Sequence, residues 1–138
     1  MGFEEKIVKL LWKEGKYTEE LLEIYEEAPD DEDFVLLKMK LTDEVITFKR
    51  ENCFEALEQL RYYLEQKNIQ IQCNGAALNV YPSPMALSMG VGRLAYKLHL
   101  GRQAKMEDLV DIFNCDEDLK FVTINEQLNH YEDWLKSL

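Results

Sequence analysis

Apolar positions in the first 28 residues recur at intervals of three and four, which is typical of an amphipathic helix. In residues 3–13 these positions are Phe3, Ile7, Leu10 and Leu11. Gly15 can end that helix, Thr18 can cap a second one, and Pro29 would stop it. Residues 1–28 are therefore predicted to form a helical hairpin, which the acidic connector Pro-Asp-Asp-Glu-Asp follows.

Strand patterns come next along the chain. Apolar runs at 34–41 and 45–50 flank a Thr-Asp-Glu turn and predict a β-hairpin. Residues 69–73 alternate between apolar and polar side chains, as a half-buried strand does. The Asn-Gly pair at 74–75 is the favoured two-residue hairpin turn, since both residues tolerate positive φ. Residues 76–81 are then expected to form the returning strand.

Helical spacing returns at 51–67, where Phe54, Leu57, Leu60 and Leu64 share one stripe. Residues 93–100 alternate again, with Leu94 and the other even-numbered residues on one face. Residues 105–113 fit either a helix or a strand, and the short, β-branched apolar run at 109–113 favours a strand. Thr123 and Glu126 form a capping box that predicts a C-terminal helix.

These elements predict a single α+β domain over residues 1–138. The helical hairpin occupies 1–28, and residues 34–138 form an antiparallel sheet of about five or six strands with a middle helix and a C-terminal helix. No apolar run approaches the roughly 20 residues that span a bilayer, so no membrane association is expected. The N-terminus mixes acids with bases, unlike a secretory signal, which favours a cytoplasmic protein.

The charge is strongly negative and unevenly distributed. The formal net charge is −11, and residues 1–33 hold twelve acids against four lysines, a balance of −8 that leaves −3 for the rest. Such a field repels nucleic acid and anionic lipid, and it would speed the encounter with a basic protein; solubility alone is the alternative explanation. The predicted partner-binding face comprises Glu19, Glu23, Glu26, Glu27, Asp30, Asp31 and Asp33.

Cysteine and histidine supply no recognisable site. Cys53, Cys73 and Cys115 are odd in number and widely spaced, which argues against a disulfide framework and against a zinc site. Each cysteine is expected to be a buried, reduced, apolar residue. His99 and His130 occur in no metal-binding pattern. The sequence therefore predicts no metal and no cofactor.

The irregular stretch at 79–100 is the second candidate site. Ser83 and Pro84 resemble the start of a single helical turn, which Gly90 can close, while Gly92 permits another special conformation. Ordered loops of this kind often bind ligands. The candidate residues are Asn79, Tyr81, Ser83, Arg93, Tyr96 and His99. Ser83 and an exposed Arg93 could hold an anion or a partner's carboxylate; alternatively Ser83 only caps, the tyrosines pack and Arg93 is solvated.

The same stretch, NVYPSPMALSMGVGRLAYKLHLG, resembles a segment that recurs in a family of small bacterial proteins of uncharacterised function. The shared pattern is Tyr-Pro-Ser, Met, Ser-Met-Gly-x-Gly and Ala-Tyr, and the later runs LVDIF and NEQLNHYEDWL are similar as well. The resemblance covers about the last half of the chain. It implies a bacterial cytoplasmic protein and no particular activity.

Motifs of catalysis are missing from the sequence. It contains no G-x-S-x-G elbow and no Walker loop, and Gly-Val-Gly at 90–92 lacks the third glycine of a dinucleotide fingerprint. The favoured prediction is a small acidic protein-binding module, an immunity-type inhibitor or a chaperone for a basic protein. An enzyme or binder that acts on a small anionic ligand at 79–100 is the alternative. A monomer and a homodimer are both compatible with the sequence.

Overall fold

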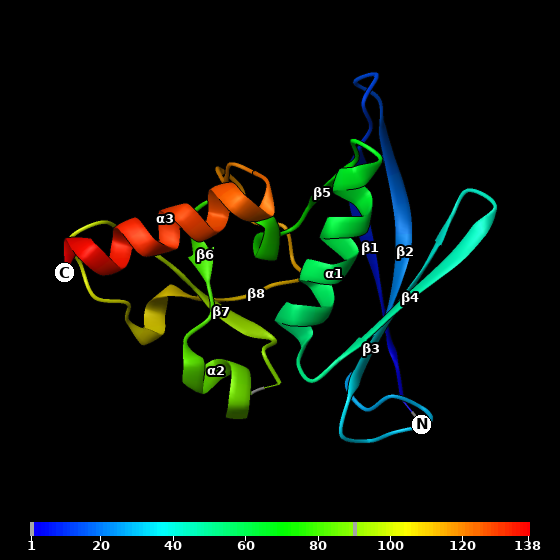
Figure 1. Cartoon of the computed structure of the whole chain (residues 1–138), viewed down its shortest axis with the longest axis horizontal. Helices are drawn as coiled ribbons and strands as arrows, with labels where there is room; N and C mark the ends of the chain where they lie inside the picture. The colour runs from blue at the N-terminus through cyan, green and yellow to red at the C-terminus, as the bar shows by residue number, and fades with distance from the viewer. Residues whose placement is uncertain (1, 90) are drawn as a thin grey trace.

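A computed structural model of the chain describes residues 2–89 and 91–138. Eight strands, three α-helices and two short 3₁₀ helices are assigned within these residues (Figure 1). In chain order they are β1 (Glu4–Leu11), β2 (Tyr17–Tyr25), β3 (Val35–Leu41), β4 (Glu44–Arg50), α1 (Cys53–Gln66), β5 (Gln70–Gln72), η1 (Asn74–Ala76), β6 (Val80–Tyr81), α2 (Pro84–Met89), β7 (Leu94–Lys97), η2 (Met106–Asp108), β8 (Leu109–Asp111) and α3 (Ile124–Ser137).

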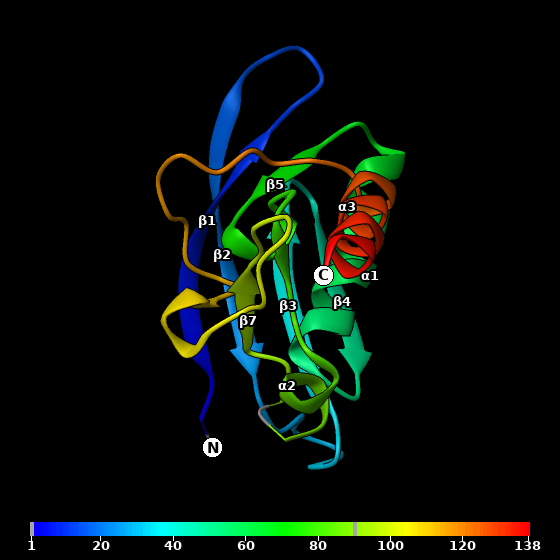
Figure 2. The ribbon, with the colours of Figure 1, turned by 90° about the vertical axis from the view of Figure 1, so that its left-hand side faces the viewer.

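The strands form two antiparallel sheets. The larger sheet has the order β4-β3-β2-β1-β5, and the smaller sheet has the order β6-β7-β8. Helix α1 packs on the face of the larger sheet that is turned toward the smaller sheet (Figure 1). Helix α3 contacts β6 and lies next to α1 (Figure 2). The chain is thus α+β, with α1 between the larger sheet and the rest of the molecule.

One apolar core joins the larger sheet to α1. Alternate residues of the strands point toward the helix because successive side chains of a strand lie on opposite faces. Phe54, Leu57, Leu60 and Leu64 of α1 are buried against them, which matches the predicted stripe. The buried residues from the strands of the larger sheet are Val8, Leu10, Leu22, Ile24, Val35, Leu37, Met39, Leu41, Ile46 and Ile71. Within residues 2–89 and 91–138, no helix combines the length and the apolar character needed to cross a membrane.

The predicted N-terminal helical hairpin is wrong, because residues 4–25 form the β1–β2 hairpin. Strand β1 pairs with β2 over its full length, from Glu4 opposite Ile24 to Leu11 opposite Tyr17. Gly15 has a φ of +91° in the turn instead of ending a helix. Adjacent apolar pairs such as Ile7-Val8 satisfy helical spacing, but they also suit a strand that carries apolar side chains on both faces. Pairing with neighbouring strands decides between a helix and a strand here.

The predicted hairpin turn at 74–75 is also wrong. These residues form η1, which is buried, and the Gly75 N–H donates to the Ile112 carbonyl at 2.9 Å. A Cβ on Gly75 would lie only 2.4 Å from the Leu57 side chain, so glycine is needed for close packing rather than for a turn. The predicted returning strand shrinks to β6, which belongs to the smaller sheet. The expected single sheet is therefore two.

Smaller differences between the predicted and the observed structure accompany the division into two sheets. Leu94 and Leu100 are exposed whereas Ala95 is buried, so the alternation of 93–100 does not place all its leucines in the core. Cys53 and Cys73 are buried free thiols, but Cys115 is exposed. The run at 109–111 is a strand, as the β-branched pattern favoured. Gly90 lies outside the described residues.

Candidate functional site

The 79–100 stretch is an ordered connection that docks on the start of α1. The Ser83 hydroxyl accepts the Ala86 N–H at 3.0 Å and caps α2. Gly92 has a φ of +69°, and its N–H donates to the Ala86 carbonyl at 3.0 Å. A Cβ there would lie 2.9 Å from Oδ1 of Asn52, the N-cap of α1, so the stretch approaches this helix closely.

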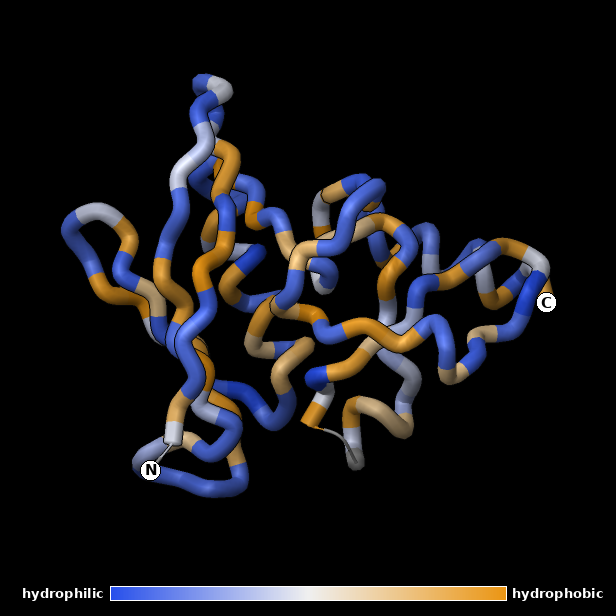
Figure 3. The backbone as a smooth tube through the Cα atoms, turned by 180° about the vertical axis from the view of Figure 1, so that it is seen from behind, coloured by the Kyte–Doolittle hydropathy of each residue, from blue (hydrophilic) through white to orange (hydrophobic). Residues whose placement is uncertain are grey.

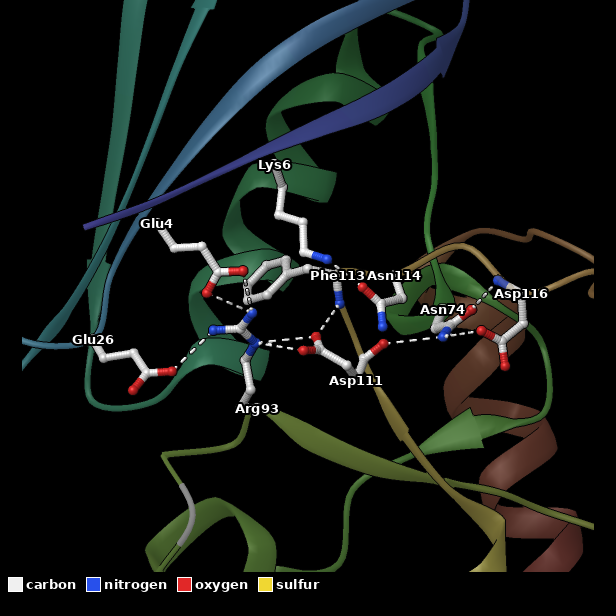
Figure 4. Close-up of polar contacts among 9 residues, drawn as sticks. All are labelled: Glu4, Lys6, Glu26, Asn74, Arg93, Asp111, Phe113, Asn114 and Asp116. Carbon is white, nitrogen blue, oxygen red and sulfur yellow. Dashed lines mark hydrogen bonds and ion pairs between the residues drawn. The ribbon is translucent and has the colours of Figure 1, made fainter. Parts of the chain in front are cut away.

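Arg93 is the centre of an ion-pair network rather than a solvated strand residue (Figure 4). Its side chain is 13% exposed. Nε lies 3.0 Å from both carboxylate oxygens of Asp111, Nη1 lies 2.9 Å from Glu26, and Nη2 lies 2.9 Å from Glu4. The guanidinium also lies over the Phe113 ring, 5.1 Å from its centroid. Arg93 thereby joins β1 and the segment just after β2 to β8.

These contacts determine what Arg93 can do chemically. Burial lowers the pKa of the guanidinium, but the hydrogen bonds that Asp111 and Glu4 accept from it outweigh burial and raise this pKa. All three nitrogens already donate to carboxylates. Three negative charges around one positive charge repel a further anion. The arrangement therefore favours a structural joint and disfavours an anion site at Arg93.

A second polar cluster continues from Asp111. Asn74 in η1 is buried, and its Nδ2 donates to the Asp111 carbonyl at 3.0 Å and to Asp116 Oδ1 at 3.1 Å. Its Oδ1 accepts the Asp116 N–H at 2.8 Å. Hydrogen bonds from Asn74 and Lys97 lower the pKa of Asp116. The Asn-Gly pair at 74–75 stands out in the sequence, but its pattern predicts a hairpin turn and not a polar cluster.

Arg61 and Gln127 form a third cluster, which sequence reasoning missed. Arg61 is only 2% exposed, and its nitrogens donate to Gly75 O, to Gln127 Oε1 and to Val122 O at 2.6–3.1 Å. Burial lowers the pKa of Arg61. Gln127 Nε2 lies 2.9 Å from each of three backbone carbonyls, Gly75, Ala77 and Val80. The cluster attaches α3 and the smaller sheet to α1.

Three of the six candidate residues in 79–100, namely Tyr81, Ser83 and Tyr96, line one groove of about 460 Å³ between β6, β7 and α3. The Tyr81 and Tyr131 rings stack at 4.1 Å, and Trp134 continues the stack 6.1 Å from Tyr131. Arg93 and His99 do not line this groove; His99 instead lies 3.8 Å from Asp108. Asn79 exchanges hydrogen bonds with Leu98 at 2.6 and 3.4 Å. Ser83, Arg93 and His99 therefore do not converge.

The acidic residues after β2 form a compact turn, residues 26–33, which we call the acidic turn. Its backbone is ordered by hydrogen bonds from Ala28 N to Phe34 O at 2.8 Å and from Phe34 N to Asp31 O at 3.1 Å. Phe3 and Tyr25 stack beside it at 4.9 Å. Tyr25 and the acidic turn border a hollow of about 390 Å³, which is lined by Gly2, Tyr25, Glu27, Ala28, Pro29, Asp30, Asp31 and Glu32.

The seven residues of the predicted acidic face do not act as one surface. Glu19 and Glu23 lie on the face of β2 turned away from α1, where the strand register places Lys9 and Lys38 opposite them. Glu26 is bound by Arg93, and Asp30 pairs with Lys49 at 3.0 Å. The other three are Glu27, Asp31 and Asp33. They are in the acidic turn, which concentrates the negative charge.

Among the described residues, His, Cys, Asp and Glu side chains form no group of three that could hold a metal ion. No protein-family model matches the chain, and neither does any curated protein.

Proposed function

We propose that this protein binds a basic protein partner through the acidic turn. The observation that carries the proposal is the hollow of about 390 Å³ that Tyr25 and the carboxylates of this turn line, with Phe3 stacked on Tyr25. Phe3 is 47% exposed. An aromatic face next to carboxylates suits a lysine or arginine side chain, because the ring attracts the cation and the carboxylates accept its hydrogen bonds.

The rest of the molecule supports this choice. The net charge of −11 would accelerate the approach of a positively charged surface and oppose anionic partners. The hydrogen-bonded backbone of the turn holds the carboxylates in place, so little ordering is required on binding. An immunity-type inhibitor or a chaperone that covers a basic protein in the bacterial cytoplasm is the class of protein that these features fit.

A charge-neutralising variant tests the proposal. Glu27→Gln, Asp31→Asn and Glu32→Gln together remove three charges and keep the hydrogen-bond acceptors of the turn. The matched control, Glu117→Gln, Glu132→Gln and Asp133→Asn, removes the same charge from exposed positions elsewhere. Each protein is immobilised and used to capture proteins from a bacterial lysate at low salt, and the association rate of a captured protein is then measured as salt is raised.

The expected result is a basic protein that the native chain and the control retain and the acidic-turn variant loses. Its association with the native chain should slow as salt rises. Equal retention by the acidic-turn variant would contradict the proposed site, and recovery of no specific basic protein at low salt would contradict the proposed function.

A further inference from the structure

Cys115 lies on a segment that connects the smaller sheet to the larger one. Beyond β8 the chain runs toward the larger sheet and then turns back toward α3 (Figures 1 and 3). Near this turning point the Lys6 side chain of β1 donates a hydrogen bond to Asn114. Cys115 lines a hollow of about 290 Å³ together with residues of β1 and with Gln72, the last residue of β5. The next residue after β5 is Cys73, so two cysteines from distant parts of the chain meet here.

Hydrogen bonds of Asn74 hold the backbone of one cysteine beside that of the other. The Asn74 N–H donates to the Asn114 carbonyl at 2.7 Å. The Asn74 side-chain oxygen accepts the Asp116 N–H at 2.8 Å, so Asn74 lies next to both residues (Figure 4). Asn114 and Asp116 are the two chain neighbours of Cys115, and Asn74 directly follows Cys73. Both neighbours of one cysteine are therefore bound to the residue that adjoins the other.

These contacts limit the distance between the two Cα atoms. The Cα of Cys73 is two bonds from the Asn74 nitrogen, and the Cα of Cys115 is three bonds from the Asn114 oxygen. This nitrogen and this oxygen are 2.7 Å apart, so standard bond lengths keep the two Cα atoms within about 8 Å of each other. A disulfide usually joins Cα atoms about 4.4–6.8 Å apart. A small shift of the turn at 114–118, most of which is exposed, is sufficient to close any remaining gap.

The two thiols differ in their access to solvent, which gives them different roles. Cys73 is fully buried, whereas Cys115 is exposed. Burial raises the pKa of the Cys73 thiol to about 12, and the nearby Cys115 contributes to the rise. Since the thiolate is the nucleophile in thiol chemistry, a dissolved reagent reacts with Cys115 before it reacts with Cys73.

We propose that Cys73 and Cys115 form a disulfide when the protein meets a low-molecular-weight disulfide such as oxidised glutathione. The Cys115 thiolate attacks one sulfur of the reagent, which forms a mixed disulfide and releases one glutathione thiolate. Cys73, deprotonated by solvent, then attacks the Cys115 sulfur and releases the second glutathione thiolate. The protein loses two electrons and the reagent gains them, while the two thiol protons end on the two glutathione molecules. In reducing compartments, disulfides of this kind serve as transient redox sensors.

The new bond would close a loop that contains the whole smaller sheet. Residues 73–115 include β6, α2, β7 and β8, and Cys73 adjoins β5 of the larger sheet. A covalent link at this point stabilises the fold because it restricts the unfolded chain. The oxidised protein is thus expected to hold its smaller sheet more firmly than the reduced protein does. Neither cysteine lines the hollow at the acidic turn, so the inference does not depend on the proposed function.

Oxidation of the native full chain with oxidised glutathione tests the inference, at about pH 9 to favour the thiolate of a buried cysteine. The remaining thiols are alkylated, and mass spectrometry identifies the linked peptides. The expected product is one intramolecular disulfide between Cys73 and Cys115, with Cys53 alkylated. Cys53→Ala removes the other buried thiol as a matched control and should give the same disulfide. Cys115→Ser changes an exposed position, so it should fold normally and give no disulfide.

A glutathione redox buffer shows whether the fold brings the two cysteines together. At a fixed ratio of oxidised to reduced glutathione, the ratio of bridged to reduced chain is measured for the folded protein and for the protein unfolded in urea. It should be higher by about tenfold or more for the folded protein, because a disulfide that fits the fold stabilises the fold by the same factor. If Cys53→Ala does not fold, the peptide assignment and this ratio for the native chain decide.

Four results would overturn the inference. A mixed disulfide on Cys115 that never converts would show that Cys73 is out of reach. A disulfide between two chains at Cys115 would identify a second copy as the partner of the exposed thiol. A bond that includes Cys53 would contradict the pairing. Equal ratios of bridged to reduced chain for the folded and the unfolded protein would show that the fold does not favour the bond.

Discussion

The larger sheet with α1 and the smaller sheet with α3 are held together by different forces. The larger sheet has four strands of seven to nine residues, and its inward side chains are aliphatic. The strands of the smaller sheet have two to four residues. Its attachment to the core depends on side chains such as Arg61, Asn74 and Gln127, which bind backbone carbonyls.

This difference shows how a short, irregular region can be ordered. Long strands satisfy their backbone groups through the ladder, and burial of apolar area supplies the stability. Strands of two or three residues leave many carbonyls without a strand partner, and buried carbonyls without a donor are costly. Buried polar side chains supply the missing donors. Arg93 then joins the two regions by its ion pairs to Glu4 and Asp111.

The largest expected effect comes from a cavity in the larger sheet. Leu37→Ala should lower the free energy of unfolding by about 4 kcal/mol, since Leu37 is fully buried and the removed atoms leave a cavity. Leu98→Ala is the matched change in the smaller region and should cost about 2 kcal/mol, because Leu98 lies outside the main apolar cluster. Urea unfolding measures both, and equal losses would contradict the contrast between the regions.

The next effect tests the polar attachment of the smaller sheet. Arg61→Leu should lower the free energy of unfolding by about 3 kcal/mol, because Val122 O and Gln127 Oε1 lose their buried donor. Arg50→Leu, on the exposed end of β4, should change it by less than about 0.5 kcal/mol. Amide exchange should accelerate mainly at residues 74–80 and 122–127. Uniform acceleration throughout the larger sheet would refute a local polar attachment.

A smaller effect concerns the joint between the regions. Arg93→Met should lower the free energy of unfolding by about 2 kcal/mol, because Glu4, Glu26 and Asp111 are left near one another without a cation in a partly screened network. Arg93→Lys keeps the charge and should recover part of the loss. The quadruple variant combines Arg93→Met with Glu4→Gln, Glu26→Gln and Asp111→Asn. If the joint is electrostatic, its loss of unfolding free energy should be smaller than the sum of the four single losses. Strict additivity would contradict an electrostatic joint.

The smallest effect is at the start of α3, which follows the smaller sheet. Thr123→Ala should lower the free energy of unfolding by about 1 kcal/mol, because it removes the cap that accepts the Glu126 N–H.

Hydrogen bonds from the Thr123 backbone and hydroxyl lower the pKa of Glu126 from its ordinary value of 4.5. The Glu126 contribution is therefore full above pH 4.5 and disappears as pH falls through the folded pKa. Glu126→Gln should lower the free energy of unfolding at pH 7 and leave it unchanged near pH 2. The same loss at both pH values would contradict the capping box.

Sequence patterns predicted an element correctly where the groups that stabilise it lie within the element itself. The capping box at Thr123 and the stripe of α1 were read directly from the sequence, and both are present. Ser83 and Pro84 start a helical turn, as their types indicate. The β3–β4 hairpin follows its two apolar runs and the short turn between them. In each case the stabilising group lies within a few residues of the position that it stabilises.

The candidate sites were harder to predict because their partners are distant in sequence. Arg93 is an exposed strand residue by its pattern, and only the approach of Glu4 and Glu26 makes it a half-buried joint. Gly75 is a turn residue by its pattern, yet it is required where Leu57 packs against it. Residues 17–21 of β2 lack a strand neighbour on the β3 side, and no sequence pattern indicates this, because it results from the divergence of two hairpins.

The amino-acid sequence by itself determined the caps of α2 and α3, the apolar face of α1, and the concentration of negative charge in residues 1–33. Those features depend on residue type and on short spacing. Only the tertiary structure decided that residues 4–25 are strands, that the strands divide into two sheets, that Arg61 is buried and that Arg93 is ion-paired. Apolar residues on both sides of a segment fit a helix and a strand equally well, and the choice is made by the backbone partners that the rest of the chain brings alongside.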